Sequence, residues 1–112
     1  ELQRANFMHR TVLVSFDWHA LAHAKKIAPD AICWCTTKPN AGVSAADVKA
    51  AGANGWFCAL DDANDDAIAS ARARDLSFGV WTVNDAVNMR RLIARNADAI
   101  CTDRPDRLQQ LL

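Results

Sequence analysis

Aromatic and polar residues follow two apolar runs of the chain, at points where a binding site could form. Trp81 lies in the second half of the run that begins at Phe78 and Asn84 follows that run, while Phe16 closes the run that begins at Val12. An indole ring can pack against the apolar part of a ligand and exclude water. The amide of Asn84 can donate and accept hydrogen bonds. Two structural alternatives stay open at this point, namely core packing for Trp81 and helix capping for Asn84.

Metal-binding patterns are weak in this sequence. His19 and His23 are four residues apart, a spacing that can chelate a metal on a helix, but Lys26 shares their predicted helix face. A solvated surface explains these residues better. The acidic turn at positions 61–66 lacks the glycine and the terminal glutamate of a calcium loop. Its carboxylates suit the N-terminus of a helix, so we predict no metal ligand here.

Four cysteines fall inside apolar runs: Cys33, Cys35, Cys58 and Cys101. Free cysteine is among the most buried residue types, so we predict four buried thiols that pack as small apolar groups. A four-cysteine zinc site would prefer paired ligands in a C-x-x-C spacing, which is absent. A disulfide framework is the third alternative, and no secretory context supports it.

The spacing of the apolar runs predicts a repeated strand-helix unit. Strands are expected to begin near residues 11, 31, 55, 77 and 98, with helical patterns between them. Apolar strands separated by helices indicate a parallel sheet covered by helices. A doubly wound sheet would carry a glycine-rich turn after an early strand, and the chain has only four glycines without such a turn. Five units suit a little over half of a (β/α)₈ barrel of about 250 residues.

The individual elements follow from capping and breaking residues. Asp17, Ser44 and Asp85 stand at predicted helix starts, and Pro105 suits the first position of a last helix. A further helix is expected to start after the acidic turn. The predicted strands are 11–16, 31–37, 55–60, the run around 78–83, and 99–102. The predicted helices are 17–28, 45–51, 67–74, 86–95 and one from Pro105. Residues 1–6 look like the tail of an earlier helix.

Composition excludes several classes of function. The 112 residues carry 13 basic and 13 acidic side chains, so nothing indicates a surface for nucleic acid or for an anionic membrane. No apolar run is long enough for a membrane span and no signal peptide opens the chain, so we expect a cytoplasmic protein. Because the first residue is Glu1 rather than methionine, we expect the chain to be part of something longer.

Three motifs in order resemble one family. They are the strand that ends in Ser15-Phe16, then the segment Val80-Trp81-Thr82-Val83-Asn84-Asp85, and then Ala97-Asp98-Ala99-Ile100-Cys101-Thr102-Asp103-Arg104-Pro105-Asp106. All three are similar to the closing part of glycerophosphodiester phosphodiesterases. The resemblance spans nearly all of the chain. It implies an α/β fold, strands four to eight of a TIM (β/α)₈ barrel of the phospholipase-C-like phosphodiesterase type. Residues 1–112 would then be the C-terminal part of one such domain, with its N-terminal part absent.

The family's catalytic residues find no match in this chain. The resemblance implies a divalent cation, magnesium or calcium, with two assisting histidines and a lysine near the phosphate, all from the first half of the barrel. Glu1 is the only glutamate, so neither glutamate-bearing family motif is present. The pair His9-Arg10 precedes its strand, whereas the family's His-Arg pair follows one. We therefore expect no catalytic residue, no metal ligand and no bound cation on this chain alone.

The resemblance assigns a substrate wall to this chain. It implies that Trp81, Asn84 and Phe16 bind the glycerophosphodiester at the barrel mouth. Lys38 could reach a phosphate, although loop lysines are usually just solvated. The leading hypothesis is the C-terminal half of a metal-dependent enzyme that releases glycerol 3-phosphate and an alcohol. The alternative is a non-catalytic half-barrel that acts as a binding or assembly module.

Partners follow from the same hypothesis. Strands that belong in a closed barrel leave unpaired edges, expected at 11–16 and 99–102, and exposed inner side chains. We therefore expect the isolated chain to associate with the missing N-terminal half-barrel or with itself.

Overall fold

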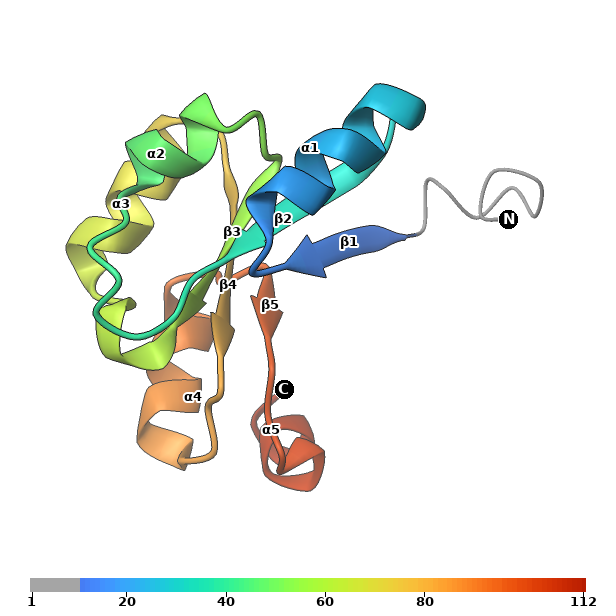
Figure 1. The fold of residues 1–112 in the computed structure, drawn as a ribbon. Coiled ribbons are helices and arrows are strands. Elements are labelled where there is room, and N and C mark those ends of the chain that lie inside the picture. Colours follow the sequence, from blue (N-terminus) through green and yellow to red (C-terminus); the bar gives the residue numbers. More distant parts are fainter. Residues whose placement is uncertain (1–10) are drawn as a thin grey trace.

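The computed structural model describes residues 11–112 as alternating strands and helices (Figure 1). The predicted helix tail at 1–6 and the pair His9-Arg10 lie outside the described residues. The strands are β1 (Val12–Ser15), β2 (Ile32–Thr36), β3 (Gly55–Ala59), β4 (Ser77–Trp81) and β5 (Ala99–Ile100). The helices are α1 (Trp18–Ile27), α2 (Ala45–Ala50), α3 (Asp65–Ala73), α4 (Ala86–Ala94) and α5 (Pro105–Leu111), and a 3₁₀ turn, η2, spans Leu60–Asp62.

The five strands form one parallel sheet in the order β1-β2-β3-β4-β5, which matches their order in the sequence. Each crossover therefore adds its strand on the same side, and the sheet curls without reversing direction (Figure 1). The result is a curled half-barrel of the α/β class, which confirms the predicted fold. A doubly wound sheet would instead reverse its strand order near the middle.

Capping side chains set the starts of four helices. Asp17, Ser44, Asn64 and Asp85 each accept a hydrogen bond from a backbone N–H in the first turn of the following helix. Such caps satisfy donors that have no partner inside the helix. Asn64 shows that the third helix begins at residue 65, two residues before the predicted start. The first position of α5 is Pro105, as predicted, because proline has no N–H to leave unpaired there.

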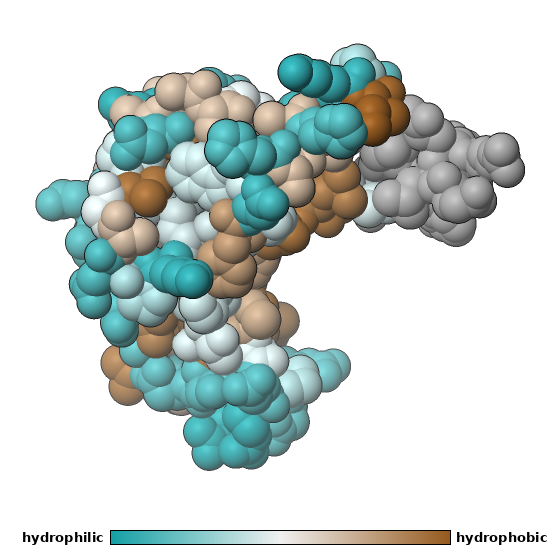
Figure 2. Space-filling view, viewed as in Figure 1, coloured by the Kyte–Doolittle hydropathy of each residue, from teal (hydrophilic) through white to brown (hydrophobic). Residues whose placement is uncertain are grey.

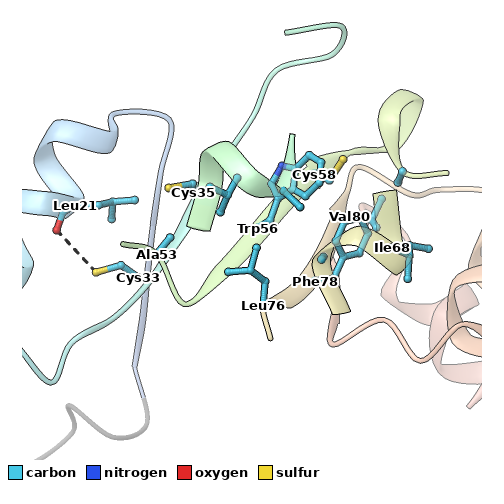
Figure 3. Close-up of a cluster of buried hydrophobic side chains, with 14 of the residues drawn as sticks. Leu21, Cys33, Cys35, Ala53, Trp56, Cys58, Ile68, Leu76, Phe78 and Val80 are labelled. Atoms are coloured by element: carbon cyan, nitrogen blue, oxygen red, sulfur yellow. Dashed lines mark hydrogen bonds between the residues drawn. The ribbon is translucent and has the colours of Figure 1, made fainter. Parts of the chain in front are cut away.

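The helices cover the convex face of the sheet and build the hydrophobic core there. Figure 3 shows side chains of β2, β3 and β4 meeting side chains of the helices, with Trp56 and Phe78 in ring contact at 5.5 Å. The large side chains that are fully buried come from strands, from helices and from the loop after β4: Phe78, Met89, Leu92, Val48, Val80 and Val83. Within the residues that the structure describes, helices therefore cover the convex face of the sheet.

The concave face of the sheet carries the other set of alternating side chains. Val12, Val14 and Phe16 are 42%, 46% and 51% exposed, although all three are large and apolar. Figure 2 shows brown, hydrophobic surface at the hollowed side of the molecule, where β1 and β5 face each other. Since side chains alternate along a strand, the same five strands have one packed face and one open face.

Trp34 is a large apolar residue of the concave face that is nevertheless buried, at 8% exposed. Its indole lies across a glycine of the neighbouring strand β3 and a glycine of the next strand, β4. A Cβ atom on Gly55 would stand 2.7 Å from the ring, and one on Gly79 would stand 2.9 Å from it. Real Cβ atoms essentially never come so close, so both glycines provide the room that this indole occupies.

One prediction about burial is wrong. Cys101 is exposed rather than buried, because it lies beyond the short strand β5 and faces the open concave side. Within residues 11–112, every helix is too short or too polar to cross a lipid bilayer.

Candidate substrate site at the strand ends

A hollow of about 290 Å³ lies where the carboxyl ends of the strands converge. Its wall is almost entirely apolar, and each of the five strands or the residues just after it contributes. The lining consists of Val14, Ser15, Phe16, Thr36, Phe57, Trp81, Thr82 and Cys101. In barrels built from parallel strands, active sites form at this end. The curl of the sheet therefore gathers residues from 14 to 101 into one site.

Phe16 and Trp81 form the centre of this wall. Phe16 follows β1 and Trp81 ends β4, with two strands between them in the sheet order. Their ring centroids are nevertheless 5.7 Å apart and the rings are almost perpendicular, at 87°. Edge-to-face contact of this kind is a favoured aromatic geometry. The structure thus brings together two of the three predicted site residues, while their contact with a substrate stays a prediction.

Asn84, the third predicted site residue, lies outside the lining of this hollow. Its side-chain oxygen accepts hydrogen bonds from the backbone N–H of Asp103 at 2.9 Å and from the Thr102 hydroxyl at 3.2 Å. Its amide nitrogen donates to Asp103 Oδ2 at 3.2 Å. The helix cap considered for this position is provided by Asp85 instead. Asn84 therefore ties the loop after β4 to the loop after β5, and so positions the rim of the site.

A second, larger hollow adjoins the first and has a polar rim. It has a volume of about 500 Å³ and is lined by Phe16, Asp17, Trp18, His19, Thr36, Thr37, Lys38, Ala41 and Val43. The two hollows share Phe16 and Thr36. The Nζ atom of Lys38 lies 6.0 Å from the centroid of the Phe16 ring. Among the carboxylates of residues 11–112, none forms an ion pair with this lysine, so its charge faces the open rim.

Sequence reasoning named Phe16 and Trp81 but missed other residues of this wall, among them Phe57 and Thr36. Both belong to strands that were correctly expected, and both alternate with core residues along their strand. The signal that could have found them is the period of two. Cys35 and Cys58 belong to the packed face, so their neighbours Thr36 and Phe57 must face the barrel interior.

The thiols of the convex face carry no reactive chemistry. Burial raises the pKa of Cys58 to about 12 and that of Cys35 to about 11, and it also raises the pKa of Cys33. A neutral buried thiol is a poor nucleophile and a poor metal ligand. The predicted buried packing is confirmed for these three cysteines.

The described residues offer no metal centre. His19 and His23 are both exposed on α1, in line with the predicted solvated face. Between Thr11 and Leu112, His, Cys, Asp and Glu side chains nowhere gather in a group of three that could hold an ion. The divalent cation expected from the family resemblance therefore does not fit these residues.

A curled sheet of parallel strands with its site at their carboxyl ends defines the class of (β/α)₈-barrel proteins. Residues 4–107 match the model of the glycerophosphoryl diester phosphodiesterase family, so the chain belongs to that family. This finding confirms the resemblance inferred from the motifs around Phe16, Trp81 and Asp103. A comparison with curated proteins found no match for this chain.

Solved structures of similar fold extend this result. A protein named as a glycerophosphoryl diester phosphodiesterase from Silicibacter pomeroyi DSS-3 is 29% identical, with a TM-score of 0.89 over 98% of this chain and 40% of its own. A glycerophosphodiester phosphodiesterase from Parabacteroides distasonis ATCC 8503 is 23% identical, with a TM-score of 0.84 over 98% of this chain and 46% of its own.

A phosphodiesterase from Oleispira antarctica, solved with the product sn-glycerol-3-phosphate, is 18% identical. Its TM-score is 0.78 over 89% of this chain and 40% of its own. The chain described here thus spans less than half the length of each of these three structures.

Proposed function

We propose that this chain forms the C-terminal half of a metal-dependent phosphodiesterase domain that hydrolyses glycerophosphodiesters to glycerol 3-phosphate and an alcohol. The observation that carries the proposal is the aromatic hollow around Phe16 and Trp81, placed at the strand ends of a chain that belongs to this family. The Oleispira antarctica phosphodiesterase, which shares the fold and holds sn-glycerol-3-phosphate, supports the same class of substrate.

In this proposal the chain binds and orients the substrate. The rings of Phe16 and Trp81 pack against the carbon atoms of the diester and keep water away from them. Lys38, next to the Phe16 ring, provides a positive charge at the rim of the adjoining hollow. Asn84 keeps the two rim loops together through its bonds to Thr102 and Asp103. These contributions position the phosphate without performing the bond cleavage.

The remaining chemistry belongs to another part of the domain. When bound, a magnesium or calcium ion would neutralise charge on the phosphate oxygens. Since the described residues do not fit such an ion, the proposal assigns the cation and the acid and base residues to an N-terminal half-barrel. That half would also cover the exposed concave side chains Val12 and Val14. Self-association of the isolated chain stays a prediction.

Steady-state hydrolysis of glycerophosphocholine with magnesium or calcium tests the proposal. We expect the isolated chain to be inactive and the full-length protein to be active. In the full-length protein, Trp81→Ala should lower kcat/KM by about tenfold or more, because apolar contacts in a pocket are worth that much. Its melting temperature should change little, since Trp81 is only half-buried.

Trp56→Ala is the matched control, because Trp56 is 3% exposed on the convex face. It should cost about 3–5 kcal/mol of unfolding free energy and leave the kinetics of the folded fraction unchanged. Clear turnover by the isolated chain would overturn the proposed division between the two halves. A full-length protein that binds glycerol 3-phosphate without hydrolysing any diester would support the alternative, a non-catalytic binding module.

A further inference from the structure

Two adjacent threonines at the end of β2 differ in the hydrogen bonding of their hydroxyl groups. Thr36 and Thr37 are 7% and 5% exposed, so both hydroxyl groups are removed from water. The hydroxyl of Thr37 accepts a hydrogen bond from the Trp56 indole N–H at 3.0 Å, within the packed convex side. The hydroxyl of Thr36 finds no hydrogen-bond partner anywhere in the part of the chain that the structure describes.

A buried hydroxyl without a partner is costly, and such groups are rare in folded proteins. Thr36 belongs to the set of residues that faces the concave side, and it lines both hollows at the strand ends. Its position is fixed by the backbone, because its carbonyl oxygen accepts a hydrogen bond from the Trp18 indole N–H at 3.3 Å. The residue that carries the unused hydroxyl is therefore held in place between the two hollows.

The surroundings of this hydroxyl define what can bind it. The rings of Phe16, Phe57 and Trp81 line the same hollow and present mostly carbon surface, and the indole N–H of Trp81 is a second polar group there without a partner among the described residues. The Ser15 hydroxyl, which also lines this hollow, already accepts a hydrogen bond from the backbone N–H of Asp17 at 2.9 Å. An occupant that matches this wall has a short carbon skeleton that carries a hydroxyl group.

We propose that Thr36 is a specificity-determining residue, whose hydroxyl binds a hydroxyl group of the diester substrate while the aromatic wall packs against its carbon atoms. This inference rests on the proposed function and adds the residue that recognises the polyol character of the substrate. A threonine hydroxyl can both donate and accept, so either partner of the hydrogen bond can supply the proton.

Competing substrates measured on Thr36→Val in the full-length protein test the inference. Valine keeps the shape of threonine and removes only the hydroxyl. The ratio of kcat/KM for glycerophosphocholine to kcat/KM for bis(4-nitrophenyl) phosphate, which has no hydroxyl, should fall about threefold to tenfold, as expected for one neutral hydrogen bond. Thr36→Ser keeps the hydroxyl and should keep the ratio near that of the wild type.

Glycerophosphoinositol distinguishes the two possible sources of the substrate hydroxyl. Glycerophosphocholine has free hydroxyl groups only on its glycerol part, whereas glycerophosphoinositol has them on both parts. An equal loss for both substrates places the Thr36 contact on glycerol. A loss for glycerophosphoinositol alone places it on the alcohol. Either result supports the proposal.

Cys58→Ala is the matched control, because Cys58 is 0% exposed on the convex face and lines neither hollow. It removes a buried side-chain donor, so it should lower the melting temperature without changing the substrate ratio. If Thr36→Val behaves in the same way, with a lower melting temperature and an unchanged ratio, its hydroxyl pairs with another part of the protein and the inference is wrong. If the wild type hydrolyses none of these diesters, the proposed function fails, and this inference fails with it.

Discussion

The convex and concave faces of the sheet use the same five strands and bury their side chains in opposite ways. On the convex face, Phe78 and Val80 are fully buried beneath helices that the chain itself supplies. On the concave face, Val12, Val14 and Phe16 remain about half exposed. A large apolar face open to water is unusual in a folded monomer and commonly marks an interaction surface. The residues described here therefore cover only one face of the sheet, the convex one.

Polar groups follow the same division. The indole N–H of Trp56 on the convex face donates to Thr37. The buried side-chain nitrogen and oxygen atoms that lack a partner within residues 11–112 belong to Trp34, Thr36 and Trp81, and all three residues lie on the concave face. Native proteins leave few such groups unpaired. The concave face is therefore shaped for contacts with atoms beyond the described residues, which include a substrate in the proposed function.

The largest expected difference between the two faces is in the reactivity of their cysteine thiols. Cys101 is exposed on the concave side, whereas Cys33, Cys35 and Cys58 are buried on the convex side. With a thiol reagent such as 5,5′-dithiobis(2-nitrobenzoic acid), one thiol should react rapidly in the native protein. The other three should react at least about a thousandfold more slowly, because the fold must open before the reagent can reach them. Cys101→Ala should abolish the fast phase.

The pH dependence of stability follows from the same burial. Burial raises the pKa of Cys58 from 9.0 to about 12 in the folded state. The unfolded state therefore loses this proton first, and the stability that the neutral thiol provides is complete below pH 9 and lost as the pH rises toward 12. Urea unfolding between pH 8 and 11 should show this decline.

The thiol-reagent experiment has a result that would contradict this burial. If three or four thiols react rapidly at pH 8, the convex face is not the closed core described here.

The next largest difference concerns two phenylalanines. Phe78 is 0% exposed on the convex face, and Phe16 is 51% exposed on the concave face. Phe78→Ala should cost about 3–5 kcal/mol of unfolding free energy, because it leaves a cavity in a packed core. Phe16→Ala should cost about 1 kcal/mol or less, mostly from its ring contact with Trp81. Urea denaturation of both variants measures the difference, and equal losses would contradict the open concave face.

The fold could be predicted from sequence because each local signal agreed with the others. Asp17, Ser44 and Asp85 cap helices where they were expected to, and the five strands begin within about a residue of their predicted starts. The exception was α3, where Asn64 rather than a later residue caps the helix. An acidic turn offers several equivalent caps, so propensity alone could not choose among them.

The site was predictable only in part. Phe16 and Trp81 were identified as wall residues, but their contact depends on how far the sheet curls, which no local pattern encodes. Asn84 was expected at the wall, and its actual bonds to Thr102 and Asp103 depend on the meeting of two loops. The unpartnered hydroxyl of Thr36 could not be found at all from sequence. Whether a polar atom is paired is a property of three-dimensional geometry.

The smallest expected effect tests whether Trp34 really fills part of the concave face. A Cβ on Gly55 would stand 2.7–2.8 Å from three atoms of the Trp34 ring. Gly55→Ala should therefore cost about 1–3 kcal/mol of unfolding free energy, as overpacking does. In a Trp34→Leu background the clash is removed, and the same substitution should cost clearly less. The difference between the two costs is the coupling between positions 34 and 55.

Gly42→Ala is the matched control for this cycle. Gly42 has φ +71 and open space around its Cβ direction, so alanine is strained there for a reason unrelated to Trp34. Its cost should be the same in the wild-type and Trp34→Leu backgrounds, within the few tenths of a kcal/mol typical of independent sites. Urea denaturation of the six proteins completes both cycles. If Gly55→Ala is as additive as Gly42→Ala, the indole does not lie across β3, and the concave face is more open than its one buried tryptophan indicates.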